Sequence, residues 1–308
     1  MDRFDAMQTF ARVVEAGSFT KAAQTLHMSR TTATQLVQQL ESRLRVKLLH
    51  RTTRTVRLTE DGAVYYGRVV RLLADLEDAD TSVSSASAAP KGRLRVDVPS
   101  PIARLILMPA LPDFHARYPD IQLDMGVSDR MVDLVSDHID CVLRAGELAD
   151  SSLTARRVGE LPLGVYAAPS YLARCGTPAH PQALEDSPHR TVGFLGARNG
   201  HITPIAMRRD GVQLEVQGRY VVAVDDGNAY LAAGLAGMGV MCVPSYMAAP
   251  YLAQGELVPL FEEWRFETMP LYVVFPANRH VGAKLRVFMD WVAGLMALRV
   301  PMSDPRPG

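Results

Sequence analysis

The sequence has few cysteines and no long hydrophobic run. Its three cysteines, Cys141, Cys175 and Cys242, are far apart and odd in number, so they suggest neither a disulfide framework nor a metal-binding spacing. No stretch approaches the roughly 20 apolar residues that span a bilayer, and charged residues near the start interrupt any signal peptide. We therefore expect a cytoplasmic protein with no metal and no membrane partner.

Catalytic motifs are also missing. The sequence lacks the G-x-S-x-G, G-x-x-x-x-G-K-[ST] and H-E-x-x-H patterns of common enzyme classes. Its eight histidines show no ligand spacing, and the GLAGMG stretch at 234–239 has its glycines in the wrong order for a dinucleotide loop. That stretch favours close packing of a helix before a strand. We predict that the protein is not an enzyme and needs no cofactor.

Charge is unevenly distributed along the chain. The 308 residues, a length that fits two domains or one large one, carry no formal net charge. Between Lys21 and Thr59, however, there are eight basic residues and a single acid, Glu41, so this segment has a formal charge of +7. A basic head on an acidic remainder predicts a polyanionic partner at one end of the molecule.

Residues 4–16 and 29–44, with a short helix between them, predict a helix-turn-helix. Apolar residues recur at steps of three and four, Gly17 can end the first helix, and Ser18 and Ser29 can cap the next two. The outer face of 29–44 carries hydrogen-bonding side chains and no acid near its start, which suits a helix that enters the major groove of DNA. Taken alone, such a face is also typical of an ordinary amphipathic helix with a solvated side.

A small β-hairpin, or wing, is predicted to follow this helix. Residues 51–59 alternate in and out around the polar tip Thr52-Thr53-Arg54. The alternative is a solvated basic loop. In a hairpin, three side chains would lie within reach of phosphates or of a minor groove, namely Arg51, Arg54 and Arg57.

A heptad pattern comes next and predicts self-association. Its apolar positions recur by four and three residues over about three heptads, at Tyr65, Val69, Leu72, Leu76, Ala79 and Val83. A lone helix would leave this stripe exposed to water, so we predict that it pairs with a second copy of the chain. Small residues up to Pro90 then form a linker.

From residue 91 onward, strand and helix patterns alternate. We expect strands at 93–99, 121–127, 141–144, 163–168, 191–194, 240–243 and 271–275. Helices are expected at 102–118, 230–235, 246–253 and 283–298, with a further short helix before Cys141. Such alternation predicts α/β units on mainly parallel sheets.

These segments together resemble a known family. The stretch SFTKAAQTLHMSRTTATQLVQQLESRLRVKLLHRTTRTVRLTEDG at 18–62 resembles the N-terminal signature of LysR-type transcriptional regulators. In the second half of the chain, RAGELADSSLTARRVGELPLGVYAAPSYL and AAGLAGMGVMCVPSYM are similar to the family's effector domain. Two residues depart from the family pattern: Thr31 stands where many members have proline, and Arg45 where a glycine usually ends the helix.

The resemblance covers nearly the whole chain and implies a multidomain α and α/β fold. It implies a winged helix-turn-helix at 1–62, a linker helix for dimerisation at 63–89, and an effector-binding domain at 90–308. This last domain would have the two-lobed fold of periplasmic binding proteins, with two crossovers joining lobe I (90–161 and 269–300) to lobe II (162–268). The implied partners are double-stranded promoter DNA, a small-molecule effector, further copies of the chain in a dimer or tetramer, and RNA polymerase.

The resemblance also implies which residues bind DNA. They are Ser18, Ser29, Arg30, Thr31, Thr32, Thr34, Gln35, Gln38, Arg51, Thr52, Thr53 and Arg54. Chemically, Arg30 can bond a guanine edge with two N–H groups, and Gln35 or Gln38 can do the same with an adenine. The nearby basic residues would set affinity through phosphates.

The implied effector site lies between the lobes. Its expected residues are Ser100, Pro101, Ile102, Ser128, Arg144, Phe194, Asp225 and Asn228. Arg144 could pair with a carboxylate ligand, whereas the acidic pair at 225–226 would repel one, so the ligand's charge stays open. Each residue also has a structural alternative: Ser100 and Asp225 could be helix caps, and Arg144 could form an internal ion pair.

The sequence has two alternatives to a ligand-modulated regulator. A cytoplasmic solute-binding protein would leave the basic head unexplained. A ligand-independent, architectural DNA-binding protein would have no use for a large α/β cleft. We therefore predict a sequence-specific transcriptional regulator whose activity depends on a small-molecule effector.

Overall fold

The computed structural model describes residues 2–51, 56–84, 90–130, 134, 139–146, 148, 153–197, 200–276 and 281–300. The chain forms two compact units, Met1–Ala88 and Ala89–Gly308, named here the N-terminal and C-terminal units. Among the described residues, no helix is both long and apolar enough to cross a membrane.

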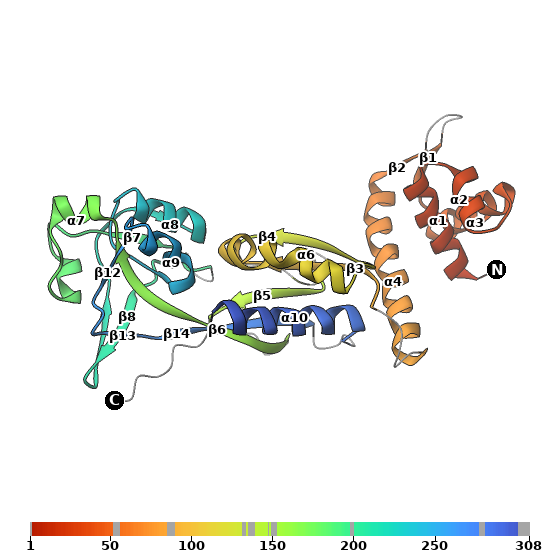
Figure 1. The fold of residues 1–308 in the computed structure, drawn as a ribbon. Helices are drawn as coiled ribbons and strands as arrows, with labels where there is room; N and C mark the ends of the chain where they lie inside the picture. Colours follow the sequence, from red (N-terminus) through yellow and green to blue (C-terminus); the bar gives the residue numbers. More distant parts are fainter. Residues whose placement is uncertain are drawn as a thin grey trace. The chain divides into compact units, whose positions relative to one another are not determined.

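The N-terminal unit is a helix-turn-helix with a hairpin and a long final helix (Figure 1). Its elements are α1 (Arg3–Ala16), α2 (Phe19–Thr25), α3 (Arg30–Leu44), β1 (Leu49–Arg51), β2 (Val56–Leu58) and α4 (Glu60–Ser84). Helix α1 ends at Gly17, which takes the left-handed conformation with φ 59°. The core consists of buried apolar side chains from α1, α3 and the residues before β1, chiefly Phe10, Val13, Leu36, Val37, Leu40 and Leu48.

The predicted wing is present as the antiparallel pair β1 and β2. Leu49 lies opposite Leu58, and Arg51 lies opposite Val56. The predicted tip, Thr52-Thr53-Arg54, lies outside the described residues.

Helix α4 contains the predicted heptad seam, but the first half of that seam serves the unit's own core. Val69 is fully buried there, and the half-buried Tyr65 ring packs against Phe10 with centroids 5.9 Å apart. The reason is that the start of α4 lies against α1, so these two side chains are covered within the chain. Leu72 and Leu76 are 55% and 42% exposed. Val69 has no exposed surface for a partner in this unit, so its predicted contact needs correction, whereas the contact through the half-buried Tyr65 stays a prediction. The side chains of Ala79 and Val83 lie outside the description.

The C-terminal unit begins with alternating strands and helices, as predicted. Its first elements are β3 (Gly92–Val98), α5 (Ser100–Ile102), the π-helical turn η1 (Ala103–Leu107), α6 (Met108–Arg117), β4 (Ile121–Val127), β5 (Cys141–Ala145), β6 (Leu153–Ala167) and α7 (Pro169–Cys175). Those that follow are the 3-10 turn η2 (Pro181–Glu185), β7 (Thr191–Phe194), β8 (Ile205–Arg209), β9 (Val212–Val216), β10 (Tyr220–Val224), α8 (Gly227–Leu235), β11 (Met241–Pro244), α9 (Ser245–Ala253), β12 (Val258–Leu260), β13 (Arg265–Phe266), β14 (Thr268–Pro276) and α10 (Ala283–Arg299). The short helix predicted before Cys141 falls on residues outside the description.

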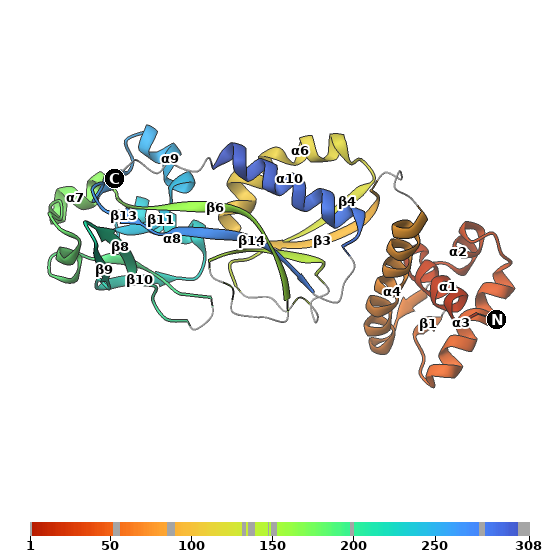
Figure 2. The same cartoon turned by 90° about the horizontal axis from the view of Figure 1, so that it is seen from below.

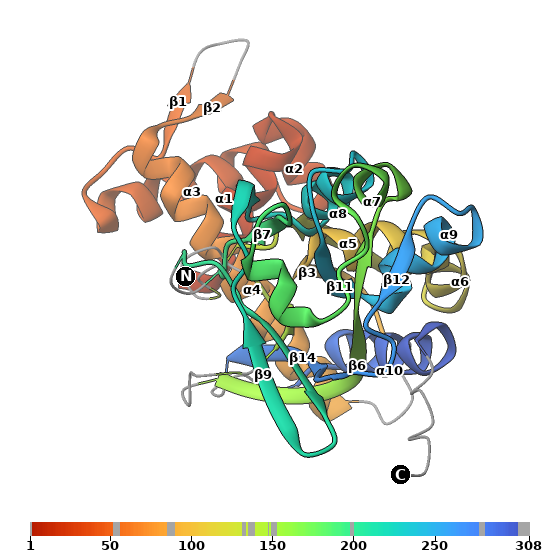
Figure 3. The same ribbon diagram turned by 90° about the vertical axis from the view of Figure 1, so that its left-hand side faces the viewer.

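Two long strands join the two lobes of this unit. Strands β6 and β14 pair side by side in antiparallel register from Thr268–Pro162 to Pro276–Leu153. They connect the lobe that holds α6 and α10 to the lobe that holds α7, α8 and α9 (Figure 2). The second lobe also contains the small sheet β13-β8-β9, whose strand β9 is labelled in Figure 3. The expected two-lobed α/β architecture is thus confirmed.

The prediction of mainly parallel sheets was wrong. Parallel pairing is found for β3 with β4, β3 with β5, and β7 with β10. In the largest sheet, of order β11-β6-β14-β5-β3-β4 with β12 also on β6, the pairs made by β6 and β14 are antiparallel. The physical reason is that β14 returns along β6 from the second lobe to the first, so it must run in the opposite direction.

Candidate nucleic-acid interface and ligand cleft

The outer face of α3 presents side chains that make no internal polar contact. Arg30, Thr31, Gln35 and Gln38 are exposed. Among the described residues, the side chains of Arg30, Gln35 and Gln38 form no hydrogen bond or ion pair. The face opposite is buried in the core of the unit. This arrangement leaves several donors and acceptors available to an outside partner.

Other predicted DNA-binding residues are used to begin the helices. The Ser18 side chain accepts the Lys21 amide and caps α2. The Ser29 hydroxyl accepts the Thr32 amide at 3.0 Å and lies 2.8 Å from the Thr32 hydroxyl. The Thr34 hydroxyl donates to the Arg30 carbonyl at 2.9 Å. These hydroxyls sit near the start of α2 or α3, where helix N–H groups favour phosphate.

One acid in this unit was not predicted as functional. Glu41 is only 2% exposed, and one of its oxygens accepts the backbone amides of Leu48 and Leu49 at 3.0 and 3.2 Å. Its other oxygen is 3.3 Å from the ammonium of Lys47. Glu41 therefore ties the start of β1 to the end of α3 and holds the wing against the helix. Its position as the lone acid of the basic segment was the available sequence signal.

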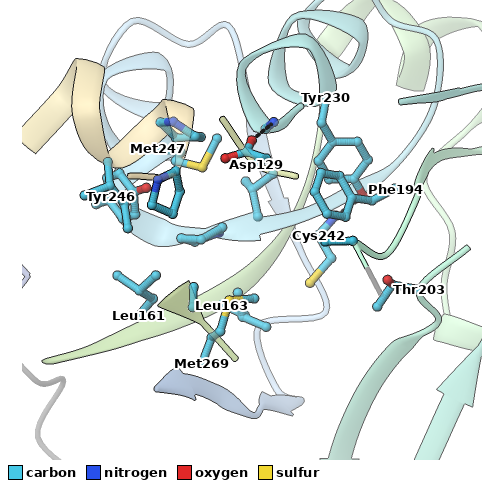
Figure 4. Close-up of a pocket in the computed structure, with 18 of the residues that line it drawn as sticks. Asp129, Leu161, Leu163, Phe194, Thr203, Tyr230, Cys242, Tyr246, Met247 and Met269 are labelled. Atoms are coloured by element: carbon cyan, nitrogen blue, oxygen red, sulfur yellow. Dashed lines mark hydrogen bonds between the residues drawn. The ribbon is translucent and has the colours of Figure 1, made fainter. Parts of the chain in front are cut away.

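The C-terminal unit contains a cleft of about 440 Å³ between its lobes. Figure 4 shows Phe194, Tyr230 and Cys242 on one side of it, and Leu161, Leu163 and Met269 on another. The Phe194 and Tyr230 rings are 5.3 Å apart. Of the residues predicted for the effector site, those that line the cleft are Pro101, Ile102, Arg144 and Phe194. A mainly apolar wall with a few polar groups is typical of small-molecule sites.

The remaining predicted effector residues join the lobes beside the cleft. The Asn228 amide donates to the Ser100 hydroxyl at 2.6 Å. The Ser128 hydroxyl accepts the amide of Arg130, whose guanidinium in turn pairs with Asp225 at 2.9 Å. The cap of α8 is Asp226 and not Asp225. The structure thus brings these four predicted residues together in one polar region, whose partners lie on both lobes.

Asp129 is the central residue of this region, and the sequence reasoning missed it. One carboxylate oxygen accepts the Ser100 amide at 2.8 Å, and the other accepts the Gly227 amide at 2.5 Å. Burial raises the pKa of the Asp129 carboxyl, an effect that outweighs the opposing influence of the two amides. The lobes approach closely here: a Cβ atom added to Gly227 would lie only 2.5 Å from the Pro101 side chain. An acid two residues after the end of β4 was the sequence signal, since ligands gather at the carboxyl ends of parallel strands.

Arg144 reaches the cleft but is held by the protein. Its guanidinium is 3.4 Å from the buried Asp97 carboxylate. It also donates to the carbonyls of Leu143 and Arg130 at 3.0 and 3.2 Å. The internal ion pair considered from the sequence is therefore present, and it coexists with a place in the cleft wall.

Burial raises the pKa of the titratable phenols and of the thiol in the cleft. It raises the pKa of Cys242 to about 12 and raises the pKa of Tyr230. The pKa of Tyr246 is raised by burial first and by the Asp129 charge second. Among the described residues, no group of three or more His, Cys, Asp or Glu side chains could hold a metal ion. These phenols and the thiol are neutral groups in a mainly apolar wall that also contains Asp129, Arg144 and Glu267.

Two family models match this chain. The model described as "Bacterial regulatory helix-turn-helix protein, lysR family" matches residues 4–63. The model described as "LysR substrate binding domain" matches residues 87–297. The two matches correspond to the parts that contain α3 and the cleft, respectively.

Similar proteins and structures carry regulatory names. The chain is 37% identical over 297 residues to an HTH-type transcriptional repressor of Pseudomonas aeruginosa, with 96% of this chain and 93% of the relative covered. It is 34% identical over 291 residues to the regulator CrgA of Neisseria meningitidis, with 94% and 95% covered. The solved structure of CrgA matches with a TM-score of 0.59 at 32% identity, covering 95% of this chain and 98% of that one. Full-length AphB, a virulence activator of Vibrio cholerae, matches with a TM-score of 0.56 at 27% identity, covering 96% and 99%.

Proposed function

The chain belongs to the LysR family of transcriptional regulators, and from this membership we propose how its own residues read DNA and sense a ligand. Residues 1–62 would be the DNA-binding domain, 63–89 the linker helix and 90–308 the effector domain. The division of the last into lobe I (90–161, 269–300) and lobe II (162–268) is part of the proposal. The observation that carries it is the exposed polar face of α3 beside the basic wing.

In this proposal α3 enters the major groove of promoter DNA. Arg30 pairs with a guanine edge, and Gln35 or Gln38 pairs with an adenine. The hydroxyls of Ser18, Ser29 and Thr32 are placed for phosphates at the helix starts, and exposed basic side chains such as Arg57 add affinity without sequence preference.

A band-shift titration with the promoter region beside the protein's own gene tests this assignment. Arg30→Ala should reduce the preference for the specific fragment over scrambled DNA by about 1–3 kcal/mol, because a bidentate base contact is lost. Arg57→Ala should weaken both fragments alike and lower the salt dependence by about one ion. The opposite pattern, with Arg57 deciding preference and Arg30 only affinity, would reject the assignment.

We further propose that a small molecule in the cleft shifts the arrangement of the two lobes and thereby changes promoter occupancy. Ala206 lines the cleft and is half-buried, so Ala206→Trp should fill it. A promoter–reporter fusion in cells should then lose its response to growth conditions. The matched control is Ala173→Trp, on the exposed side of α7. A normal response in Ala206→Trp would argue against the cleft as the effector site.

The proposed partners also include further copies of the chain. Leu72 and Leu76 leave an exposed apolar surface on α4, which suits a dimer through the linker helix and larger assemblies built from it. RNA polymerase is a proposed partner at the promoter, and the cytoplasm is the proposed location, because the chromosome is there.

A further inference from the structure

Asp129 places its carboxylate against two backbone amides at helix starts, a position that suits an anion. Both of its oxygens are used: one accepts an amide of the first lobe from Ser100, and the other accepts Gly227, the first residue of α8 in the second lobe. Backbone amides at the start of a helix commonly donate hydrogen bonds to a bound anion. In this protein they are satisfied by the chain's own carboxylate, so they are not available to an anionic ligand.

The positive charge in the cleft, on Arg144, is also paired within the chain. Among the described lining residues, two are acidic, Asp129 and Glu267, and one is basic, Arg144. The Arg144 guanidinium contacts the Asp97 carboxylate and two backbone carbonyls. A ligand carboxylate would therefore be repelled by Asp129 and would have to share the Arg144 guanidinium with Asp97.

Neutral polar groups are available instead. The side-chain hydroxyls of Tyr246 and Thr203 line the cleft, and within the described residues neither forms a hydrogen bond. The aromatic rings of Phe194 and Tyr230 lie on one side of the cleft, and Figure 4 shows Thr203 on that same side. Such a wall can stack a flat ring and bond one carbonyl or amide.

From these contacts we propose that the effector is an uncharged, mainly apolar compound with an aromatic or similar flat group, and that Asp129 excludes carboxylates. This inference rests on the proposed function of the cleft as the effector site. It makes Asp129 a specificity-determining residue: it holds the two lobes together and at the same time closes the anion position.

Isothermal titration of the full chain near neutral pH tests the proposal with matched probes that differ only in charge. The pairs are benzamide and benzoate, naphthamide and naphthoate, and phenylbutanamide and phenylbutanoate. In the wild-type protein the best-bound amide should bind at least about tenfold more tightly than its acid. Asp129→Ser opens the two amides of Ser100 and Gly227, so it should bring the acid to equal or greater affinity.

Two further variants test whether the selectivity changes because the two amides are freed or only because a negative charge is lost. Asp129→Asn removes the negative charge but fills the same space, so it should weaken the selectivity less than Asp129→Ser does. Asp113→Ser removes one acid from the exposed ion pair with Arg117 on α6, away from the cleft, and should leave the selectivity unchanged. The wild-type comparison needs no variant, so it decides the proposal even where a substitution prevents folding.

The outcomes test separately the chemical class of the ligand and the cleft as its binding site. Equal or tighter binding of an acid by the wild-type protein, lost in Ala206→Trp, would overturn the ligand class and leave the cleft as the effector site. Selectivity that persists in Asp129→Ser would overturn the role of Asp129. Binding of no probe, or binding that Ala206→Trp does not reduce, would overturn this inference, whereas the proposed DNA binding fails only if the promoter titration fails.

Discussion

Arg45 ends α3 in the left-handed conformation, with φ 57°. Its amide donates to the carbonyls of the preceding turn, so the helix end is formed in the usual way. A residue with a Cβ is strained in this region by roughly 1–2 kcal/mol, which is the cost expected where the family pattern has glycine. Arg45 is exposed, so under the proposed DNA binding its charge is available to a phosphate.

Replacing Arg45 by glycine should separate these two effects. Arg45→Gly removes the strain from the folded protein, but it also raises the conformational entropy of the unfolded chain, which opposes folding. We therefore expect a net stabilisation of about 0.5–1 kcal/mol in urea unfolding. Promoter binding should weaken at the same time through the lost charge. Arg43→Gly, within α3, is the matched control and should destabilise by about 1 kcal/mol. A destabilised Arg45→Gly protein would show that the side chain itself supports the helix end.

Asp129 should make stability depend on pH. Burial raises its pKa above the usual 3.8, with Asp226 raising it further and Arg144 lowering it. The folded protein therefore binds a proton at Asp129 more readily than the unfolded chain does. Its contribution to the free energy of unfolding is greatest at acidic pH and falls as pH rises through the raised pKa.

Urea unfolding from mildly acidic to neutral pH measures this effect. The difference in unfolding free energy between wild type and Asp129→Ser should shrink as pH rises, because only the wild type has the buried carboxyl. Asp225→Ser, at an exposed ion pair, is the control for other titrating groups. A difference that grows with pH would mean that the two amides stabilise the charged form more than burial opposes it.

At the scale of elements, Glu41 couples α3 to the wing. It satisfies two backbone amides at the start of β1 from a buried position. Glu41→Leu would leave both amides without an acceptor, so we expect a loss of about 2–4 kcal/mol in stability. Hydrogen exchange at the Leu48 and Leu49 amides should accelerate, and promoter affinity should fall as the wing moves.

Glu41→Gln is the matched variant for this prediction. It keeps one acceptor oxygen of the same shape and loses the charge that faces Lys47. It should therefore retain most of the protection at both amides. Equal exchange rates in Glu41→Leu and the wild-type protein would show that the wing is held by its other contacts.

Local sequence patterns predicted some elements well and others poorly. Helices α1, α3 and α10 were predicted because each has a long apolar repeat, and α1 and α3 also have a polar residue at the start. Strand β4 is buried at its start and was predicted with its bounds unchanged. Only the end of β6 was expected, as a strand at 163–168. The first part of β6 contains charged, exposed residues, which are typical of a loop.

In the candidate sites, too, some residues could be predicted from the sequence and others could not. The face of α3 was predictable, since helical spacing alone decides which side chains are exposed. The role of Asp129 was not, because its partner Gly227 is 98 residues away in the sequence. Likewise, nothing local distinguishes Val69, which is buried against α1, from Leu72, which is exposed on the same helix. Contacts between distant segments decide these roles.

At the scale of the whole molecule, self-association would decide how tightly the regulator holds its promoter. Two linked reading helices bind paired half-sites with a higher effective concentration than either has alone. The exposed leucines Leu72 and Leu76 are the candidates for the contact that links them, since both leave apolar surface in water. A charge at either position would have to be buried in the interface.

Leu72→Glu combined with Leu76→Glu should therefore shift the protein to a smaller species in sedimentation velocity. Its affinity for a fragment with two half-sites should fall by about ten- to a hundredfold, while its affinity for one half-site should stay near that of the wild type. The control is Leu298→Glu, which changes an 81% exposed leucine on α10. Unchanged sedimentation of the double variant would place the contact between copies elsewhere, and equal losses on one and two half-sites would mean that the substitutions damage the reading head itself.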